Sequence, residues 1–327
     1  MLKNNKHFIY LGLITGALLL WISLRNADPV QIKSALLQAN LWYCLPFIFF
    51  LFIYYILKAI RWKMLIKPLK VVDTRDIYPP MMIGYAGSLI LPLQLGELIR
   101  VYLVSRLINV RSAPIFVSIV LERLFDFFTL LLLVIICSFF LETTNNLIQN
   151  AILIIVSICG MIFVALAFYM AFTQKFIGII NKLTSILPSN LQQSISENML
   201  AGAEGLRSIN DISLILNIFM LSIAQWLFMW ACIYLSILAI NILVTPFTAF
   251  FVLLFVIIGI SLPTTPGFIG SIQAAYYLAL APFGVSTEDA FISSVFYHII
   301  AYVCVLIVGI YYIIKYKISY DEIKSNI

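Results

Sequence analysis

Charged residues are scarce in this sequence. They make up 10% of its 327 residues, while 63% are hydrophobic. Soluble domains are about a quarter charged and about half apolar, so this composition excludes an ordinary soluble protein. It predicts instead an all-α polytopic integral membrane protein, in which the thickness of the bilayer sets the length of each helix.

Several kinds of chemistry have no support in the sequence. The five cysteines form no C-x-x-C pair, and the two histidines, His7 and His298, have no neighbours at metal-ligand spacing. No G-x-x-x-x-G-K-[ST] loop for nucleotide phosphates occurs, and no polar stretch is large enough for a catalytic domain. We therefore expect no metal and no cofactor, and active transport would have to use a gradient or a partner protein. The net charge of +6 is modest, so nucleic acid is not an expected partner.

Long apolar runs are what the sequence does contain. Runs long enough to span a bilayer occur at 8–24, 41–57, 114–141, 147–173, 212–238 and 291–314, with a shorter one at 247–262. They predict about 7–8 transmembrane helices, in addition to the two irregular regions described below. We interpret the first run as a retained helix, because it lacks the small-x-small cleavage site of a signal peptide. The mixed polar stretch 174–211 predicts short amphipathic helices on the cytoplasmic surface of the membrane.

Lysine and arginine gather in three places. One predicted loop holds Lys58, Arg61, Lys63, Lys67, Lys70 and Arg75, and further lysines mark the N-terminus and the C-terminus. The positive-inside rule makes all three places cytoplasmic in the cell membrane. The basic loop also has the composition that binds anionic lipid headgroups, and both interpretations stay open.

Two apolar regions, 77–107 and 261–282, contain residues that break helices. Those residues are Pro92 and Gly96 in the first region and Pro263, Pro266, Gly267 and Gly270 in the second. Proline inside a helix removes a hydrogen bond and introduces a clash. Irregular backbone at membrane depth is tolerated only when it is buried in protein or lines a wet cavity. Both regions are thus predicted to be broken or re-entrant helices.

The two irregular regions also resemble each other. Pro92-x-x-x-Gly96 and Pro266-x-x-x-Gly270 share one spacing, and the segments that begin at Asn109 and Gly284 align at nearly the same offset. This similarity favours an internal repeat inside one transmembrane domain 1–327, with halves at about 77–173 and 246–314. Basic residues at the ends of the corresponding helices would make the repeat inverted. Paired broken segments of this kind form the substrate site in many transporters.

Charged side chains within or beside apolar runs form the candidate site. They are Glu97, Arg100, Glu122, Arg123 and Asp126. A charge near the bilayer centre costs about 2.5–3.5 kcal/mol on insertion scales, so such residues usually pair or face water. Glu97 and Arg100 share a helix face, as do Arg123 and Asp126, and Glu122 is expected to point elsewhere, toward Arg100.

Two interpretations of these charges remain open. They are either ion pairs that join helices or the lining of a groove in which arginines donate to headgroup phosphate oxygens. Backbone N–H groups at a helix start after Gly96 or Gly270 would add to such a groove. In the second region, Gln273 and its neutral polar neighbours either satisfy backbone freed by the prolines or line the same polar path.

Three motifs together resemble the lysylphosphatidylglycerol synthase transmembrane-region family. They are LPLQLGELIRVYLVSR, LERLFD at Leu121 to Asp126, and PTTPGFIGSIQAAYYLALAPFGVS. The resemblance extends over nearly the whole chain in segment order. The family includes the flippase part of the multiple-peptide-resistance protein and hopanoid-linked transporters, so the resemblance implies a lipid transporter.

The resemblance also implies roles for individual residues. Pro92, Gly96, Glu97 and Arg100 match one family element, Glu122, Arg123 and Asp126 a second, and Pro263, Pro266, Gly267, Gly270 and Gln273 a third. The family often has a basic residue where this chain has Gln94, which predicts a less acidic headgroup here. Many members have Glu where Gln273 stands. The soluble aminoacyl-transfer domain of the bifunctional members has no counterpart in this sequence.

The leading hypothesis is therefore a flippase that moves a polar or anionic lipid through a groove where the two broken segments meet. One alternative is a membrane enzyme that acts on a lipid-linked substrate, with a carboxylate as general base. Another is a non-catalytic membrane subunit that scaffolds a separate synthase. The expected partners are membrane lipids, together with a second copy of the chain or such a synthase.

Overall fold

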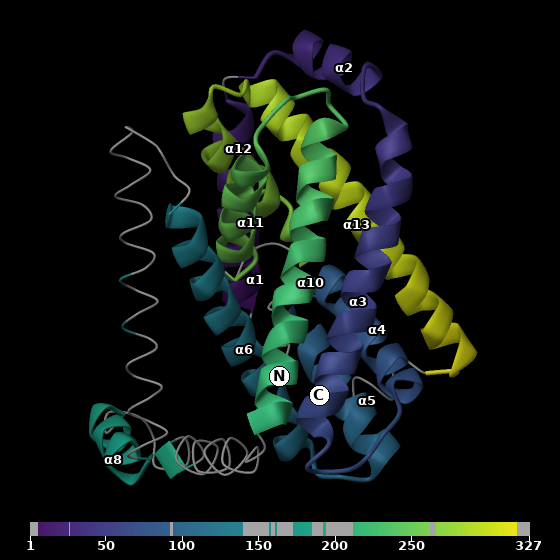
Figure 1. Ribbon diagram of the computed structural model, residues 1–327, viewed down its shortest axis with the longest axis vertical. Helices are drawn as coiled ribbons and strands as arrows, with labels where there is room; N and C mark the ends of the chain where they lie inside the picture. Colours follow the sequence, from purple (N-terminus) through teal and green to yellow (C-terminus); the bar gives the residue numbers. More distant parts are fainter. Residues whose placement is uncertain are drawn as a thin grey trace. The chain divides into compact units, whose positions relative to one another are not determined.

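The computed structural model describes residues 6–25, 27–91, 94–139, 157, 161, 173–184, 192–193, 212–261 and 266–318. These residues are mostly helical and contain no β-strand, which confirms the all-α class predicted from composition (Figure 1). Among them, Leu41–Ile66, Ile212–Leu238 and Thr287–Lys315 are long and apolar enough to cross a membrane. They match three of the apolar runs in the sequence, whereas the run at 147–173 lies almost entirely outside the described residues.

The α-helices with labels in Figure 1 follow one another along the chain. They are α1 (Lys6–Leu24), α2 (Pro29–Leu37), α3 (Cys44–Ile66), α4 (Thr74–Ile90), α5 (Gly96–Ile108), α6 (Ser112–Phe139), α8 (Thr173–Leu183), α10 (Ile212–Leu238), α11 (Pro246–Ser261), α12 (Ser271–Leu280) and α13 (Thr287–Lys315). Short 3₁₀ turns, η2 (Leu41–Tyr43), η4 (Pro266–Phe268) and η5 (Ala281–Phe283), precede α3, α12 and α13.

The chain divides into two compact units. The first comprises Met1–Ala59, Thr74–Val104 and Ala224–Ile327, and the second comprises Ile60–Asp73 and Ser105–Ile223. Both predicted breaks, with the helices that flank them, belong to the first unit, while α6 and α8 belong to the second. The units follow spatial contacts and not sequence similarity, so the internal repeat stays a prediction.

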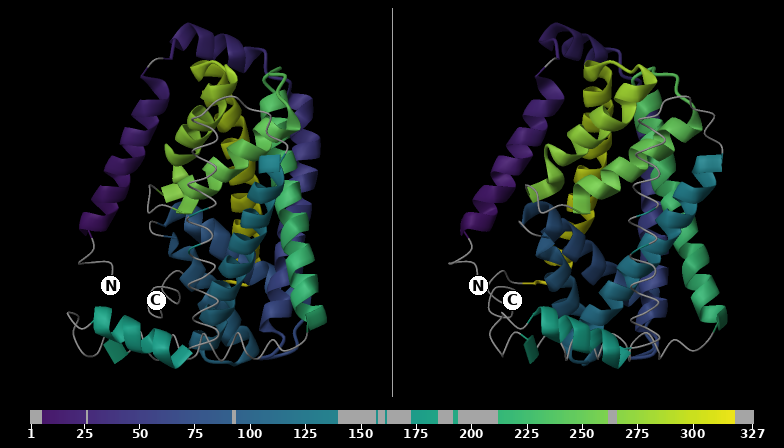
Figure 2. Two further views of the ribbon diagram at one scale, coloured as in Figure 1. Left: turned by 60° about the vertical axis from the view of Figure 1, so that its left-hand side comes forward. Right: turned by 90° about the vertical axis from the view of Figure 1, so that its left-hand side faces the viewer.

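Small residues bring the helices of the first unit close together. Helix α13 packs against α4 and α12, and α1 packs against α12 (Figure 2). A Cβ added at Gly96 would overlap the carbonyl oxygen of Gly84, and one added at Gly309 would overlap the side chain of Ala86. Such close backbone approach through small residues is a common basis of helix packing in membranes. The hydrophobic effect does not drive helices together there, because the lipid tails are as apolar as the side chains.

Both predicted breaks are present. Helix α4 ends at Ile90 and α5 begins at Gly96, while α11 ends at Ser261 and α12 begins at Ser271 after the turn η4. Pro92 and Pro263 themselves lie outside the described residues. Helix α4 contains Pro79 and Pro80 without breaking, because both stand in its first two turns, where they remove only two helical hydrogen bonds.

The basic segment before α4 is not one loop, and that part of the prediction is wrong. Lys58, Arg61 and Lys63 lie inside α3, which continues to Ile66. Lys58 is 3% exposed and Arg61 is 0% exposed, so neither is a solvated topology signal. Lys70 does lie in the turn, where its ammonium donates to the carbonyl oxygen of Ile108 at 2.9 Å. That contact places a cation at the C-terminal end of α5, where it stabilises the helix.

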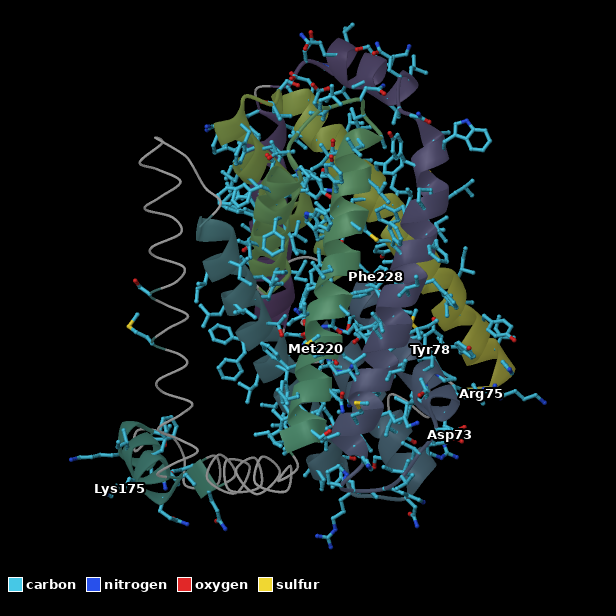
Figure 3. All side chains as sticks on the ribbon, viewed as in Figure 1. Asp73, Arg75, Tyr78, Lys175, Met220 and Phe228 are labelled. Atoms are coloured by element: carbon cyan, nitrogen blue, oxygen red, sulfur yellow. The ribbon has the colours of Figure 1, made fainter. Side chains whose placement is uncertain are left out.

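Two further details locate the remaining elements. Lys175 lies on α8 (Figure 3). Lys182 follows seven residues later on the same helix face, whereas Ile177 is buried, as expected of an amphipathic helix. Helix α8 covers the start of the polar stretch 174–211, most of which lies outside the described residues.

In the first unit, Tyr78 of α4 (Figure 3) packs against Tyr312 near the end of α13, with ring centroids 6.0 Å apart.

Candidate functional site

The helix that resumes after the first break carries a buried ion pair. Glu97 and Arg100 lie one turn apart on α5, and the distance from Arg100 Nη2 to Glu97 Oε2 is 2.7 Å. The Arg100 side chain is 0% exposed and that of Glu97 is 16% exposed. The shared helix face expected from their spacing thus becomes a direct contact. Because the guanidinium is fully buried, this pair is far more costly to disturb than a surface pair.

Tyrosine rings surround this arginine and a second cation. Arg100 Nη1 donates to the hydroxyl oxygen of Tyr85 at 3.1 Å. The Arg100 guanidinium carbon lies 5.3 Å from the centroid of the Tyr85 ring, and Lys58 Nζ lies 5.3 Å from the same centroid. Lys58 also lies 5.5 Å from the ring of Tyr54. Aromatic faces attract cations, with the largest effect where water is excluded, so the cluster holds two positive groups against one tyrosine inside the first unit.

The second break is held by a chain of three hydrogen bonds. The backbone N–H of Gly270 donates to Gln273 Oε1 at 2.8 Å. Gln273 Nε2 lies 3.1 Å from His298 Nδ1, and His298 Nε2 lies 2.7 Å from the carbonyl oxygen of Gly267. Gly267 and Gly270 have φ of 70° and 91°, a region that glycine occupies without strain. Gln273 therefore ties the turn before α12 to α13.

The two breaks meet inside the first unit. Gln94 Nε2 donates to the carbonyl oxygen of Ile260 at 2.8 Å, so a residue of the first break satisfies the end of α11. Tyr302 of α13 donates to the carbonyl oxygen of Leu89 at 3.1 Å, and a Cβ at Gly267 would press against that Tyr302 ring. These contacts satisfy helix-end carbonyls that would otherwise be orphaned in an apolar setting.

A second buried charge cluster lies in the second unit. Arg61 Nη1 donates to Asp126 Oδ1 at 2.6 Å and to Ser222 Oγ at 2.7 Å. Arg61 Nη2 lies 3.2 Å from Glu122 Oε1. Glu122 and Asp126 stand one turn apart on α6, so a single guanidinium reaches both carboxylates. The arginine thereby joins the end of α3 to α6 and to α10.

The residue next to this arginine makes a parallel contact. Trp62 is 0% exposed, and its indole N–H donates to Ser118 Oγ at 2.9 Å. The Ser118 hydroxyl in turn donates to the carbonyl oxygen of Ile115 at 2.7 Å. Arg123, by contrast, is exposed on α6. Arg61 and Arg123, which both belong to this unit, therefore differ sharply in burial.

The sequence located some of these residues and missed others. It singled out Glu97, Arg100, Glu122, Asp126 and Gln273, each of which takes part in a described polar contact. It did not indicate the partners, which are Lys58, Arg61, Tyr85, Ser222 and His298. One signal was available, because two carboxylates one turn apart in an apolar helix require a buried cation nearby.

Among the described residues, no group of three or more His, Cys, Asp or Glu side chains could hold a metal ion.

Comparisons with known proteins agree with the membrane character of the chain. No curated protein and no solved structure gives a significant match. The family model described as the lysylphosphatidylglycerol synthase TM region matches residues 9–309. The chain therefore belongs to the lysylphosphatidylglycerol synthase TM region family.

Proposed function

We propose that the protein is a flippase that moves a polar or anionic lipid across the cell membrane. The observation that carries the proposal is the buried Glu97–Arg100 pair, with Lys58 and Arg100 on one tyrosine ring, directly after a helix break. Charges at membrane depth are rare, and they usually mark substrate or ion pathways. Family membership supports the coarser statement that this is a multi-pass membrane protein of lipid modification or transport.

The contact between the two breaks supports a transport role. Transporters commonly bind substrate where two discontinuous helices meet, because the helix ends supply unsatisfied polar groups there. Here the breaks meet through Gln94 and Ile260 and through Tyr302 and Leu89. In the proposal, Gln273 and the Glu97–Arg100 pair of the first unit contact the headgroup.

Serine hydroxyls near the starts of α5 and α12 strengthen the case for a headgroup. Ser88 lies against Gly96, and Ser271 is the first residue of α12 and 1% exposed. Within the described part of the chain, the buried hydroxyl oxygens of Ser88 and Ser271 form no hydrogen bond. A helix start combines free backbone N–H groups with a positive dipole end. Both places therefore suit the oxygen atoms of a phosphate-bearing headgroup.

A fluorescent-lipid assay in proteoliposomes tests the proposal. We expect reconstituted protein to bring inner-leaflet lipid to the outer leaflet, where a membrane-impermeant reductant bleaches it, and protein-free vesicles to keep that lipid protected. Anionic phospholipids, zwitterionic phospholipids and polyprenyl-phosphate lipids would be compared, and Gln94 predicts a preference for the less acidic headgroups. No movement of any of these lipids would contradict the proposal.

The family description favours a second candidate, a membrane component of lipid modification. In that case the protein would act as an enzyme or as the scaffold of a separate synthase. Lipid extracts from cells with and without the protein separate the candidates. Loss of a modified lipid from the extract indicates modification, whereas an unchanged lipid content with the lipid retained in one leaflet indicates transport. Co-purification of a synthase would identify the scaffold.

A further inference from the structure

One titratable side chain, His298, takes part in the hydrogen bonds that hold the second break. This residue lies on α13 and is partly exposed. Its two ring nitrogens contact Gln273 Nε2 at 3.1 Å and the Gly267 carbonyl oxygen at 2.7 Å. Histidine ordinarily changes charge between about pH 5 and 8, so the surroundings of these two nitrogens decide what a proton does here.

The hydrogen bonds fix the tautomer of His298. The Gly270 N–H can only donate, so the Gln273 atom that it contacts must be the carbonyl oxygen, Oε1. The amide nitrogen Nε2 then faces His298 Nδ1 and donates to it, which leaves Nδ1 without a proton. The hydrogen of the neutral imidazole is on Nε2, where it donates to the carbonyl oxygen of Gly267. All four groups are satisfied only while His298 is neutral.

The residues that the structure describes offer no acceptor for a second proton on His298 while Gln273 keeps both of its hydrogen bonds. It would bind the lone pair of Nδ1 and place an N–H against the N–H of Gln273. If the Gln273 amide turns over, its oxygen accepts from Nδ1, but its nitrogen then faces the N–H of Gly270. Either way one donor loses its acceptor. Protonation therefore disconnects Gln273 from His298 or from Gly270.

The disconnected segment is the one that forms the second break. Gly270 precedes α12 and lies against Gly16 of α1, where an added Cβ would overlap the Gly16 carbonyl. Gly267 lies against Tyr302 and the Leu89 carbonyl of the first break. Loss of the Gln273 bridge would loosen the attachment of this turn to α13 beside both breaks. The Gln273 side-chain amide can thus take two orientations, and a conformational switch requires two such states.

The neighbouring elements carry other titratable groups. On α2, α4, α12 and the cap that precedes α2 they are Asp28, Lys33, Arg75, Asp76, Tyr78, Tyr85, Tyr276 and Tyr277. Besides His298, α13 itself carries Glu288, Asp289, Tyr297, Tyr302, Cys304, Tyr311, Tyr312 and Lys315. The side chains of Lys6, His7 and Tyr10 on α1 lie outside the described residues. Within the described residues, His298 contacts Gln273, Gly267 and the Tyr302 ring, whose centroid is 5.7 Å away. A proton on His298 would therefore place a positive charge in direct contact with Gln273.

We propose that His298 is a proton-binding site that releases the second break when it is occupied, so that the proton is the ligand that drives lipid movement. The coupling of this proton to lipid movement rests on the proposed transport function, whereas proton binding and release of the turn do not. Neutral His298 holds Gly267 and Gly270 on α13, and protonated His298 frees them. A proton gradient would then supply energy to a chain that has no nucleotide-binding loop.

Amide hydrogen exchange and nitrogen NMR of the full chain in nanodiscs test proton binding directly. Because the chain has two histidines, His7→Gln leaves His298 as the single imidazole signal and serves as the matched control. We expect that signal to show an unprotonated Nδ1 at high pH and to titrate. Gly270 should exchange about tenfold faster at low pH, after correction for intrinsic rates, as expected for the loss of about one hydrogen bond.

Two substitutions carry the test further. His298→Gln keeps a donor for Gly267 but does not titrate, so the pH response of Gly270 should disappear. In Gln273→Glu the carboxylate accepts from both the Gly270 N–H and protonated His298. The midpoint of the His298 imidazole titration should therefore move up by about one pH unit, which is about tenfold in proton affinity. An unchanged pH response of Gly270 in His298→Gln, or a proton on Nδ1 in the neutral form, would overturn the proposal.

Lipid movement in proteoliposomes separates this inference from the transport function. We expect the rate to rise as pH falls from about 8 to 5, in His7→Gln as in the unmodified chain, and to be insensitive to pH in His298→Gln. If no lipid moves at any pH while Gly270 responds as described, transport is contradicted and the proton site stands. If lipid moves with the same pH dependence in His298→Gln, the coupling is contradicted and transport stands.

Discussion

At the scale of single residues, Arg61 joins several buried polar groups. One guanidinium reaches Asp126, Glu122 and Ser222, and it is 0% exposed. Taking three charges out of water is costly, and the loss is offset only when the geometry joins them closely. The cluster therefore makes the packing of α3, α6 and α10 in the second unit dependent on one side chain.

Replacing Arg61 tests this dependence. Arg61→Gln leaves two buried carboxylates without their guanidinium, so we expect the free energy of unfolding to fall by about 3–5 kcal/mol. Arg123→Gln is the matched control on the same unit, because Arg123 is exposed and surface substitutions usually change stability by less than about 0.5 kcal/mol. Thermal unfolding in detergent measures both variants. Equal losses of stability would show that Arg61 is not the stabilising residue.

The sequence could predict these carboxylates but not their arginine. Glu122 and Asp126 stand out because a charge inside an apolar run is improbable without a role. Arg61 was assigned to a solvated loop, because a cation at the end of an apolar run looks like a topology signal. Only the continuation of α3 to Ile66 places it in the interior. His298 was missed for a related reason, since its role depends on Gln273 and Gly267, which are distant in sequence.

At the scale of elements, the breaks themselves were predictable. Proline and glycine act on the local backbone, so their positions mark where a helix ends regardless of tertiary structure. The close approach of the flanking helices was less accessible. Gly84 and Gly96 permit α4 and α5 to touch, but glycine in a sequence does not show which surface it will face.

Adding a methyl group to Gly96 tests the contact between α4 and α5. The new Cβ would overlap the backbone of Gly84 and Ser88, so the helices must separate. We expect Gly96→Ala to lower the free energy of unfolding by about 1–3 kcal/mol, as overpacking does.

A glycine elsewhere provides the comparison. Gly178 lies on α8 with nothing within 4 Å of an added Cβ. Gly178→Ala should raise stability by as much as about 1 kcal/mol, because alanine is the better helix former. Opposite signs for the two variants in one unfolding assay are the expected result. A Gly96→Ala protein as stable as the unmodified chain would contradict the close contact.

At the scale of the whole molecule, composition determined the class and charge bias determines the expected orientation. Lys6 precedes the first long apolar run and Lys315 ends the last one. The positive-inside rule predicts that both ends lie in the cytoplasm. Three described helices are long and apolar enough to cross the bilayer. The total number of crossings also depends on the broken segments, whose depth is set by packing and not by hydropathy.

Reporter fusions test the orientation. A fluorescent protein that folds only in the cytoplasm should be bright when it is fused to either end of the chain, because both ends are expected on the same side. An alkaline phosphatase that is active only outside the cytoplasm should be inactive at both ends. A bright fusion at one end and a dark fusion at the other would imply an odd number of crossings and contradict this topology.

The central claim is that the buried pair after the first break contacts the lipid that is moved. Glu97→Gln with Arg100→Gln removes the two charges of the pair together, so that neither is left without the other and the protein should fold. We expect this double variant to lose at least about tenfold in the rate of fluorescent-lipid movement in proteoliposomes, since hydrogen bonds to charged groups contribute about 1.5–3 kcal/mol. Arg123→Gln should lose less. Unchanged movement in a folded double variant would reduce the pair to a structural contact and contradict the account.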